Sequence, residues 1–144
     1  MCQAWKWFII LFETALMLEV IITGFFWLML WPILKNKPLV KNATPLLYFE
    51  IVITHILPFA ALLIDFLLHT TPIPMRHLVL AISTGVVYVM VNMIIVLSTG
   101  NLIYPMFTWT DTKSYTLLVI LIAIAVMVYS LMSWVSMARL ARGS

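Results

Sequence analysis

Five ionisable residues lie within long apolar runs of this sequence, where a charge is costly to bury. They are Glu13, Glu19, Glu50, His55 and Asp65. Carboxylates and imidazoles take up and release protons in catalysis and in proton transfer. An ionisable group near the centre of a bilayer costs about 2.5–3.5 kcal/mol on insertion scales, so it should face protein or water. These five residues are therefore the first candidates for function.

Two of the candidates, Glu19 and His55, are placed at matching depths. Glu19 comes 12 residues before Trp31, and His55 comes 10 residues after Pro45. At ~1.5 Å per helical residue, both lie roughly 15–18 Å from the loop between their segments. We therefore predict a contact between Glu19 and His55. The alternative is that each side chain faces a different helix and bonds a hydroxyl group.

A proline at position 58 lies in the same apolar segment as His55. Proline removes one helical hydrogen bond, which frees the carbonyl of Thr54 and predicts a kink. A histidine beside a kink at mid-depth suits proton handling, because the ordinary pKa of histidine is about 6.5. The alternative is a neutral His55 that satisfies a loosened carbonyl.

Two of these acids and one arginine are predicted to stabilise the structure. Glu13 and Asp65 fall near the opposite membrane face from the first loop, and Arg76 follows the second connection. An ion pair between Asp65 and Arg76 would close that connection. Structural pairing is therefore our interpretation of both residues.

Small and weakly polar residues recur on the last two apolar segments. Gly85, Asn92 and Thr99 are seven residues apart, and a group of serines follows later, at 130, 133 and 136. Such stripes are typical of packing faces between membrane helices. We interpret both as packing faces, with the alternative that Asn92 or Tyr88 lines a ligand cavity.

The sequence gives no sign of a cofactor, a metal site or a nucleic-acid surface. Its histidines are 14 and 8 residues apart, and its single cysteine, Cys2, excludes an internal disulfide. It contains no phosphate-binding loop, dinucleotide fingerprint or block of five basic residues. We expect no cofactor, no metal and no nucleic-acid partner.

The elements that must position these residues follow from composition. The chain has 144 residues, of which 65% are hydrophobic and 9% are charged, whereas soluble domains have about 45–50% and about 25%. Four segments reach the roughly 20 apolar residues that a membrane-spanning helix needs, at about 5–34, 45–68, 74–99 and 114–140. Their short connections predict that neighbouring helices are antiparallel. We predict an all-α integral membrane protein, a single transmembrane bundle over residues 1–144.

Several short motifs in the middle of the chain agree in order and spacing with a known family. They are His55-Ile56-Leu57-Pro58-Phe59, residues 63–68, Pro74-Met75-Arg76-His77-Leu78, Tyr88, Thr99-Gly100, Ile103-Tyr104-Pro105 and Trp109. Over residues 5–109 the sequence resembles the androgen-induced protein and rolling stone family of multi-helix membrane proteins.

The resemblance implies a possible chemistry for His55. Members of this family include threonine-dependent hydrolases of lipid esters, notably fatty acid esters of hydroxy fatty acids. The family histidine corresponds to His55, which would act as general base toward a threonine hydroxyl. The family nucleophile belongs to an earlier helix, upstream of the aligned residues. The candidate substitutes are Thr14, Thr23 or a threonine supplied by another chain, since Thr54 points about 100° away from His55.

These observations support two hypotheses of different classes. The first is a non-catalytic accessory subunit of a larger membrane complex, derived from the hydrolase-like fold, whose partners are membrane lipids and other transmembrane subunits. The second is an intramembrane lipid-ester hydrolase that uses His55 as general base. A third hypothesis, a small channel or proton carrier, is supported only by Glu19, Glu50 and His55. An energy-converting membrane, such as the mitochondrial inner membrane, fits the first hypothesis, although no residue specifies an organelle.

Overall fold

The molecule is built from helices and their connections. A computed structural model describes residues 3–41, 44–68 and 71–143, and every regular element in these ranges is helical. Within these ranges, four helices are long and apolar enough to cross a membrane, namely Gln3–Leu34, Pro45–Leu68, Met75–Thr99 and Thr112–Arg142. They fall on the four predicted segments, which confirms the prediction of an all-helical chain with four long apolar helices. The chain divides into two compact units, Met1–Thr71 and Pro72–Ser144.

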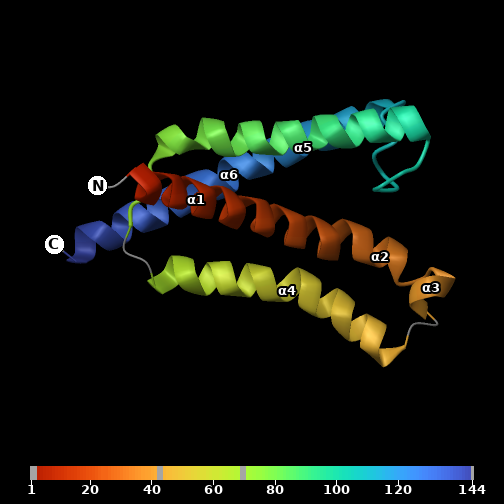
Figure 1. Cartoon of the computed structure of the whole chain (residues 1–144), viewed down its shortest axis with the longest axis horizontal. Helices are drawn as coiled ribbons and strands as arrows, with labels where there is room; N and C mark the ends of the chain where they lie inside the picture. Colours follow the sequence, from red (N-terminus) through yellow and green to blue (C-terminus); the bar gives the residue numbers. More distant parts are fainter. Residues whose placement is uncertain (1–2, 42–43, 69–70, 144) are drawn as a thin grey trace. The chain divides into compact units, whose positions relative to one another are not determined.

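Unit 1 contains the first two long helices (Figure 1). Its elements are α1 (Gln3–Phe25), the π-helical turn η1 (Phe26–Leu30), α2 (Trp31–Leu34), the short helix α3 (Pro38–Lys41) and α4 (Pro45–Leu68). The first three form one continuous rod, and α1 packs against α4. The ribbon of α4 changes direction partway along its length, as Pro58 inside this helix predicts (Figure 1).

The π-helical turn η1 has a cause in the sequence. Pro32 has no N–H group to donate to the carbonyl of Leu28, four residues earlier, so the helical ladder is weakened there. The N–H of Trp31 bonds the carbonyl of Phe26 instead, five residues earlier, which widens the turn. Both long helices of unit 1 are therefore loosened by a proline, Pro32 in one and Pro58 in the other.

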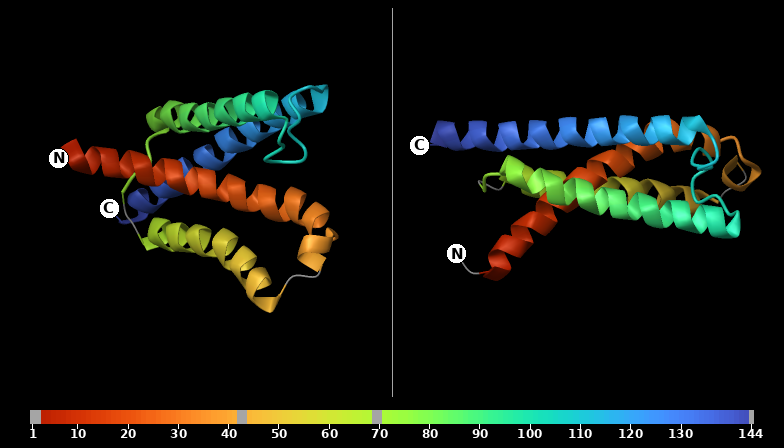
Figure 2. Two further views of the ribbon diagram at one scale, coloured as in Figure 1. Left: turned by 45° about the vertical axis from the view of Figure 1, so that its right-hand side comes forward. Right: turned by 90° about the horizontal axis from the view of Figure 1, so that it is seen from above.

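Unit 2 contains the 3₁₀ turn η2 (Met75–His77), α5 (Leu78–Thr99) and α6 (Thr112–Gly143). The helices α5 and α6 lie side by side (Figure 2). Ala81 on α5 and Ala125 on α6 are buried, and such small residues let helix backbones approach closely. Gly100 ends α5 in the left-handed conformation, with a φ of 70°, and its N–H bonds the carbonyl of Val96.

Two serines of α6 fix the segment that leads into α5. The N–H of Ile73 donates to Ser136 Oγ at 3.0 Å, and Ser133 Oγ donates to the Ile73 carbonyl at 2.7 Å. The Tyr129 hydroxyl donates to the carbonyl of Pro74 at 3.2 Å. Non-helical backbone beside apolar helices needs such partners, because an unpaired buried polar group costs several kcal/mol in lipid. These serines therefore bind backbone, in addition to forming part of a packing face.

The loop from Gly100 to Asp111 is held by one buried serine of α6. Ser114 Oγ donates to Asp111 Oδ1 at 2.7 Å and accepts from the N–H groups of Thr108 and Trp109, both at 3.1 Å. Asp111 also accepts the N–H of Ser114 at 3.0 Å, so it caps the first turn of α6. Trp109 has a positive φ of 60°, which is strained for a bulky residue. The Ser114 hydrogen bond helps to hold it there.

This cap predicts a dependence of stability on pH. Two hydrogen bonds from Ser114 hold the pKa of Asp111 below its ordinary value of 3.8. The cap therefore contributes its full stability above pH 3.8, and this contribution is lost as the pH falls through the lower pKa of the folded protein. Unfolding in lipid–detergent bicelles should show this loss in the native chain. Asp111→Asn keeps a capping residue but cannot titrate, so an equal loss in this variant would contradict the assignment.

Candidate intramembrane polar site

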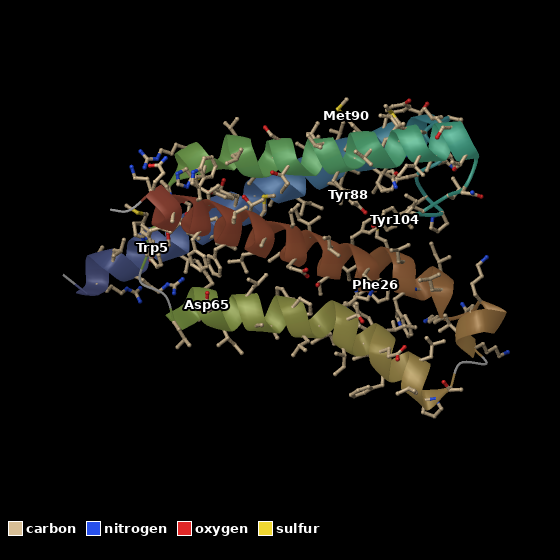
Figure 3. The ribbon with its side chains drawn as sticks, in the orientation of Figure 1. Trp5, Phe26, Asp65, Tyr88, Met90 and Tyr104 are labelled. Atoms are coloured by element: carbon tan, nitrogen blue, oxygen red, sulfur yellow. The ribbon has the colours of Figure 1, made fainter. Side chains whose placement is uncertain are left out.

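The imidazole of His55 packs on an aromatic ring where α1 and α4 meet. The rings of His55 and Phe26 are stacked, with centroids 3.6 Å apart and planes at 15°. Phe26 is buried and begins the wide turn η1. It lies on the side of its helix that faces α4 (Figure 3). The proline-induced turn therefore occurs at the residue that contacts His55.

A hydroxyl group also joins the two helices at this level. Thr23 Oγ1 donates to the backbone carbonyl of His55 at 2.9 Å. Pro58 lacks an N–H group, so the turn of α4 around Thr54 and His55 has one helical bond fewer than an intact helix. The bond from Thr23 gives this loosened turn a donor from α1 and fixes the register of the two helices.

The carboxylate of Glu19 is the third component of the site. It lies close enough to the His55 imidazole to interact with it electrostatically, although no hydrogen bond joins the two side chains. Both residues are half-buried. Glu19 and Thr23 on α1 and Phe26 at the start of η1 are spaced by four and three residues, so they share the face of this continuous rod that meets α4. Glu19 and His55 are therefore an acid and a base within electrostatic range of each other, and the predicted contact between their side chains stays a prediction.

The threonine hydroxyls near this pair donate to carbonyl groups. Thr23 donates to the carbonyl of His55, and Thr54 Oγ1 donates to the carbonyl of Glu50 at 2.7 Å. Thr14 is buried earlier on α1. Among the described residues, no threonine hydroxyl bonds the ring of His55. The geometry in the described ranges thus shows His55 and Thr23 as neighbours, with the hydroxyl proton directed away from the imidazole.

The remaining candidate acids and the arginine lie in different surroundings. Glu13 is 1% exposed, whereas Glu50 is exposed near the start of α4. Asp65 is half-buried near the end of α4 (Figure 3), and Arg76 is exposed in η2 of the other unit. The predicted ion pair between Asp65 and Arg76 stays a prediction. From the first set of candidates, the structure thus brings Glu19 and His55 together.

Asn92 belongs to a separate buried contact in unit 2. Its side-chain oxygen accepts a hydrogen bond from the indole N–H of Trp109 at 2.9 Å, and the residue is 3% exposed. The indole of Trp109 in turn stacks on Phe107, with centroids 5.0 Å apart. Asn92 therefore holds the loop that follows α5. The sequence placed it on a packing face but gave no sign of its partner.

Two contributors to this polar site were not predicted from the sequence. Phe26 was one of many aromatic residues in an apolar run, and its stacking on His55 depends on the wide turn. The available signal was Pro32, which lies inside the first predicted segment and predicts a weakened ladder one turn earlier. The hydrogen bond from Thr23 had no such signal.

No group of three or more histidine, cysteine or carboxylate side chains in the described ranges is placed to hold a metal ion. The site is instead one carboxylate, one imidazole, one hydroxyl and one aromatic ring at the contact of two apolar helices. No family model matches this chain, and no curated protein or solved structure does either. The likeness to the androgen-induced protein and rolling stone family therefore stays a resemblance of short motifs.

Proposed function

We propose that this chain is an integral membrane protein whose four long helices cross the bilayer in antiparallel order. Within unit 1, Trp31 pairs with Tyr48 at a centroid distance of 5.6 Å, and Thr23 pairs with His55. The later residue of the first rod thus meets the earlier residue of α4. Such pairing supports opposite directions for the two helices.

The contacts of unit 2 support the same order for α5 and α6. Ile73, before α5, bonds Ser136 near the end of α6. Asn92, late in α5, bonds Trp109, which comes just before α6 begins. Each unit therefore supports one hairpin of two spanning helices.

We further propose that the protein is a non-catalytic accessory subunit of a larger membrane complex. The observation that carries this proposal is the pair Glu19 and His55, which lies mid-way along two apolar helices and is only half-buried. Ionisable groups at such a depth cost about 2.5–3.5 kcal/mol each, so they face protein or water rather than acyl chains. A transmembrane helix of another subunit, with bound lipid around it, would complete their cover.

Co-purification from membranes in a mild detergent tests this proposal. The native chain should migrate in a complex with other membrane subunits, and the double variant Glu19→Gln/His55→Ala should lose them. A loss of ~1.4 kcal/mol of association free energy already weakens binding tenfold. Glu50→Gln is the matched control, because Glu50 is exposed near a helix end and should retain the partners. A monodisperse monomer of the native chain on native gels would overturn the proposal.

The lipid-ester hydrolase remains the second candidate, because Thr23 and His55 are neighbours. A fluorophosphonate probe and a fluorogenic lipid ester distinguish it from an accessory role. Labelling and hydrolysis that both His55→Ala and Thr23→Ala abolish would favour the enzyme. The accessory role predicts a native chain that is neither labelled nor active.

A further inference from the structure

The loop between α5 and α6 folds back along the side of α5. Trp109 bonds Asn92 at 2.9 Å, and Asn92 precedes the last residue of α5, Thr99, by seven positions, or ~10 Å of helix. The hydroxyls of Tyr88 and Tyr104 lie 2.7 Å apart, and Tyr88 is one turn further from the end of α5 (Figure 3). The loop is therefore anchored to the side of α5, at residues that precede the end of this helix.

The second half of this loop has internal partners for its backbone. The N–H of Phe107 bonds the carbonyl of Tyr104 at 3.1 Å, and Ser114 Oγ accepts the N–H groups of Thr108 and Trp109. The Tyr115 hydroxyl donates to the carbonyl of Trp109 at 3.1 Å. Non-helical backbone tolerates a membrane depth only with such internal satisfaction.

The first half of the loop is apolar and exposed. Leu102 and Ile103 are each 48% exposed, and no residue between Gly100 and Thr110 carries a charge. In the described ranges, no protein group accepts a hydrogen bond from the N–H of Leu102 or Ile103. These side chains favour an apolar medium, whereas their backbone groups still need an acceptor. Both requirements are met where acyl chains meet the ester groups of a phospholipid bilayer.

We infer that residues 102–105 insert into the ester and upper acyl-chain zone of the bilayer as a lipid-binding segment. Leu102 and Ile103 contact acyl methylenes, and their N–H groups donate to ester carbonyls or interfacial water. The hydroxyl of Tyr104 enters this zone already hydrogen-bonded to that of Tyr88, at 2.7 Å. The inference rests on the proposed crossing of the membrane by α5 and α6.

Depth-dependent quenching in phosphatidylcholine vesicles tests this inference. An environment-sensitive fluorophore is attached to Ile103→Cys, Val87→Cys or Thr112→Cys, each in a Cys2→Ser background. Val87 is 60% exposed and ~18 Å of helix before Thr99, and Thr112 is exposed at the start of α6. Lipids with a nitroxide at carbon 5 should quench position 103 more than lipids with one at carbon 12. The order should be reversed at position 87, and position 112 should be quenched by neither.

The outcomes separate this inference from the proposed function. Quenching at 87 with none at 103 overturns the insertion of the loop but retains the spanning helices. Absence of quenching at 87 overturns the proposed crossing itself. Deeper quenching at 103 than at 87 overturns the interfacial placement.

A second pair of variants tests whether Ser114 holds the loop in place. Ser114→Ala, made in the Ile103→Cys variant, removes the acceptor of two loop N–H groups. A water-soluble maleimide should then label the cysteine at position 103 at least tenfold faster, which is equivalent to ~1.4 kcal/mol of lost protection. Thr116→Ala is the control, because Thr116 Oγ1 only donates to the Thr112 carbonyl in its own helix. Equal labelling of both variants would contradict the role of Ser114.

Discussion

Replacing Trp109 with alanine is expected to lower the free energy of unfolding of unit 2 by ~3–5 kcal/mol, the usual loss for a buried tryptophan. The ring is 4% exposed, stacks on Phe107 and donates to Asn92 at 2.9 Å. Alanine removes the stacking, leaves a cavity and deprives Asn92 of its donor. Unfolding in bicelles by titration with sodium dodecyl sulfate measures this change.

Two controls divide the effect of Trp109→Ala into its parts. Trp109→Phe keeps an aromatic ring but removes the indole N–H, so it should cost only ~1–3 kcal/mol for the buried oxygen of Asn92 left unpaired. Trp134→Ala removes an indole that is 68% exposed and should change stability little. A loss for Trp109→Ala no greater than that for Trp134→Ala would contradict the anchoring role.

The double variant Ser133→Ala/Ser136→Ala is expected to destabilise the start of α5 by a comparable amount. Each substitution leaves a backbone group of Ile73 without its partner, the carbonyl in one case and the N–H in the other. An unsatisfied buried group costs ~1–3 kcal/mol, which gives ~2–6 kcal/mol for the pair. Hydrogen exchange of the Ile73 amide, together with the unfolding titration, measures the effect.

Ser130→Ala provides the matched control for this double variant. Ser130 Oγ donates only to the carbonyl of Val126, within its own helix, at 2.7 Å. Its removal should leave both the unfolding titration and the exchange at Ile73 unchanged. Exchange that accelerates equally in Ser130→Ala would show that the two buried serines have no specific role.

The positions of the long helices could be predicted because they depend on local composition. Runs of apolar residues long enough to span a bilayer fixed the helix 45–68 to the residue and the others to within a few residues. The helix α6 begins two residues before its predicted start, at Thr112, because Asp111 and Ser114 form a cap there. Such a cap was visible in the sequence only as two polar residues three positions apart.

The tertiary hydrogen bonds could not be predicted in the same way. Ser133 and Asn92 stood on recognisable polar stripes, but their partners, Ile73 and Trp109, lie in connections whose path depends on the whole unit. The proximity of Glu19 and His55 followed from counting residues along two neighbouring helices. Its details did not, since the stacking on Phe26 requires the widened turn before Pro32.

The length of α6 has a consequence for the membrane crossing that we propose. Its 32 residues extend over ~48 Å, whereas the hydrocarbon of a bilayer is ~30 Å thick. The hydrogen bond between Ile73 and Ser136 lies at the level where the chain leads into α5. The final two turns of α6 extend past that level. They carry Arg139 and Arg142. With α6 crossing the bilayer as we propose, this overhang carries the exposed Arg142 to the phosphates of one leaflet, which limits how far the helix can slide along the membrane normal.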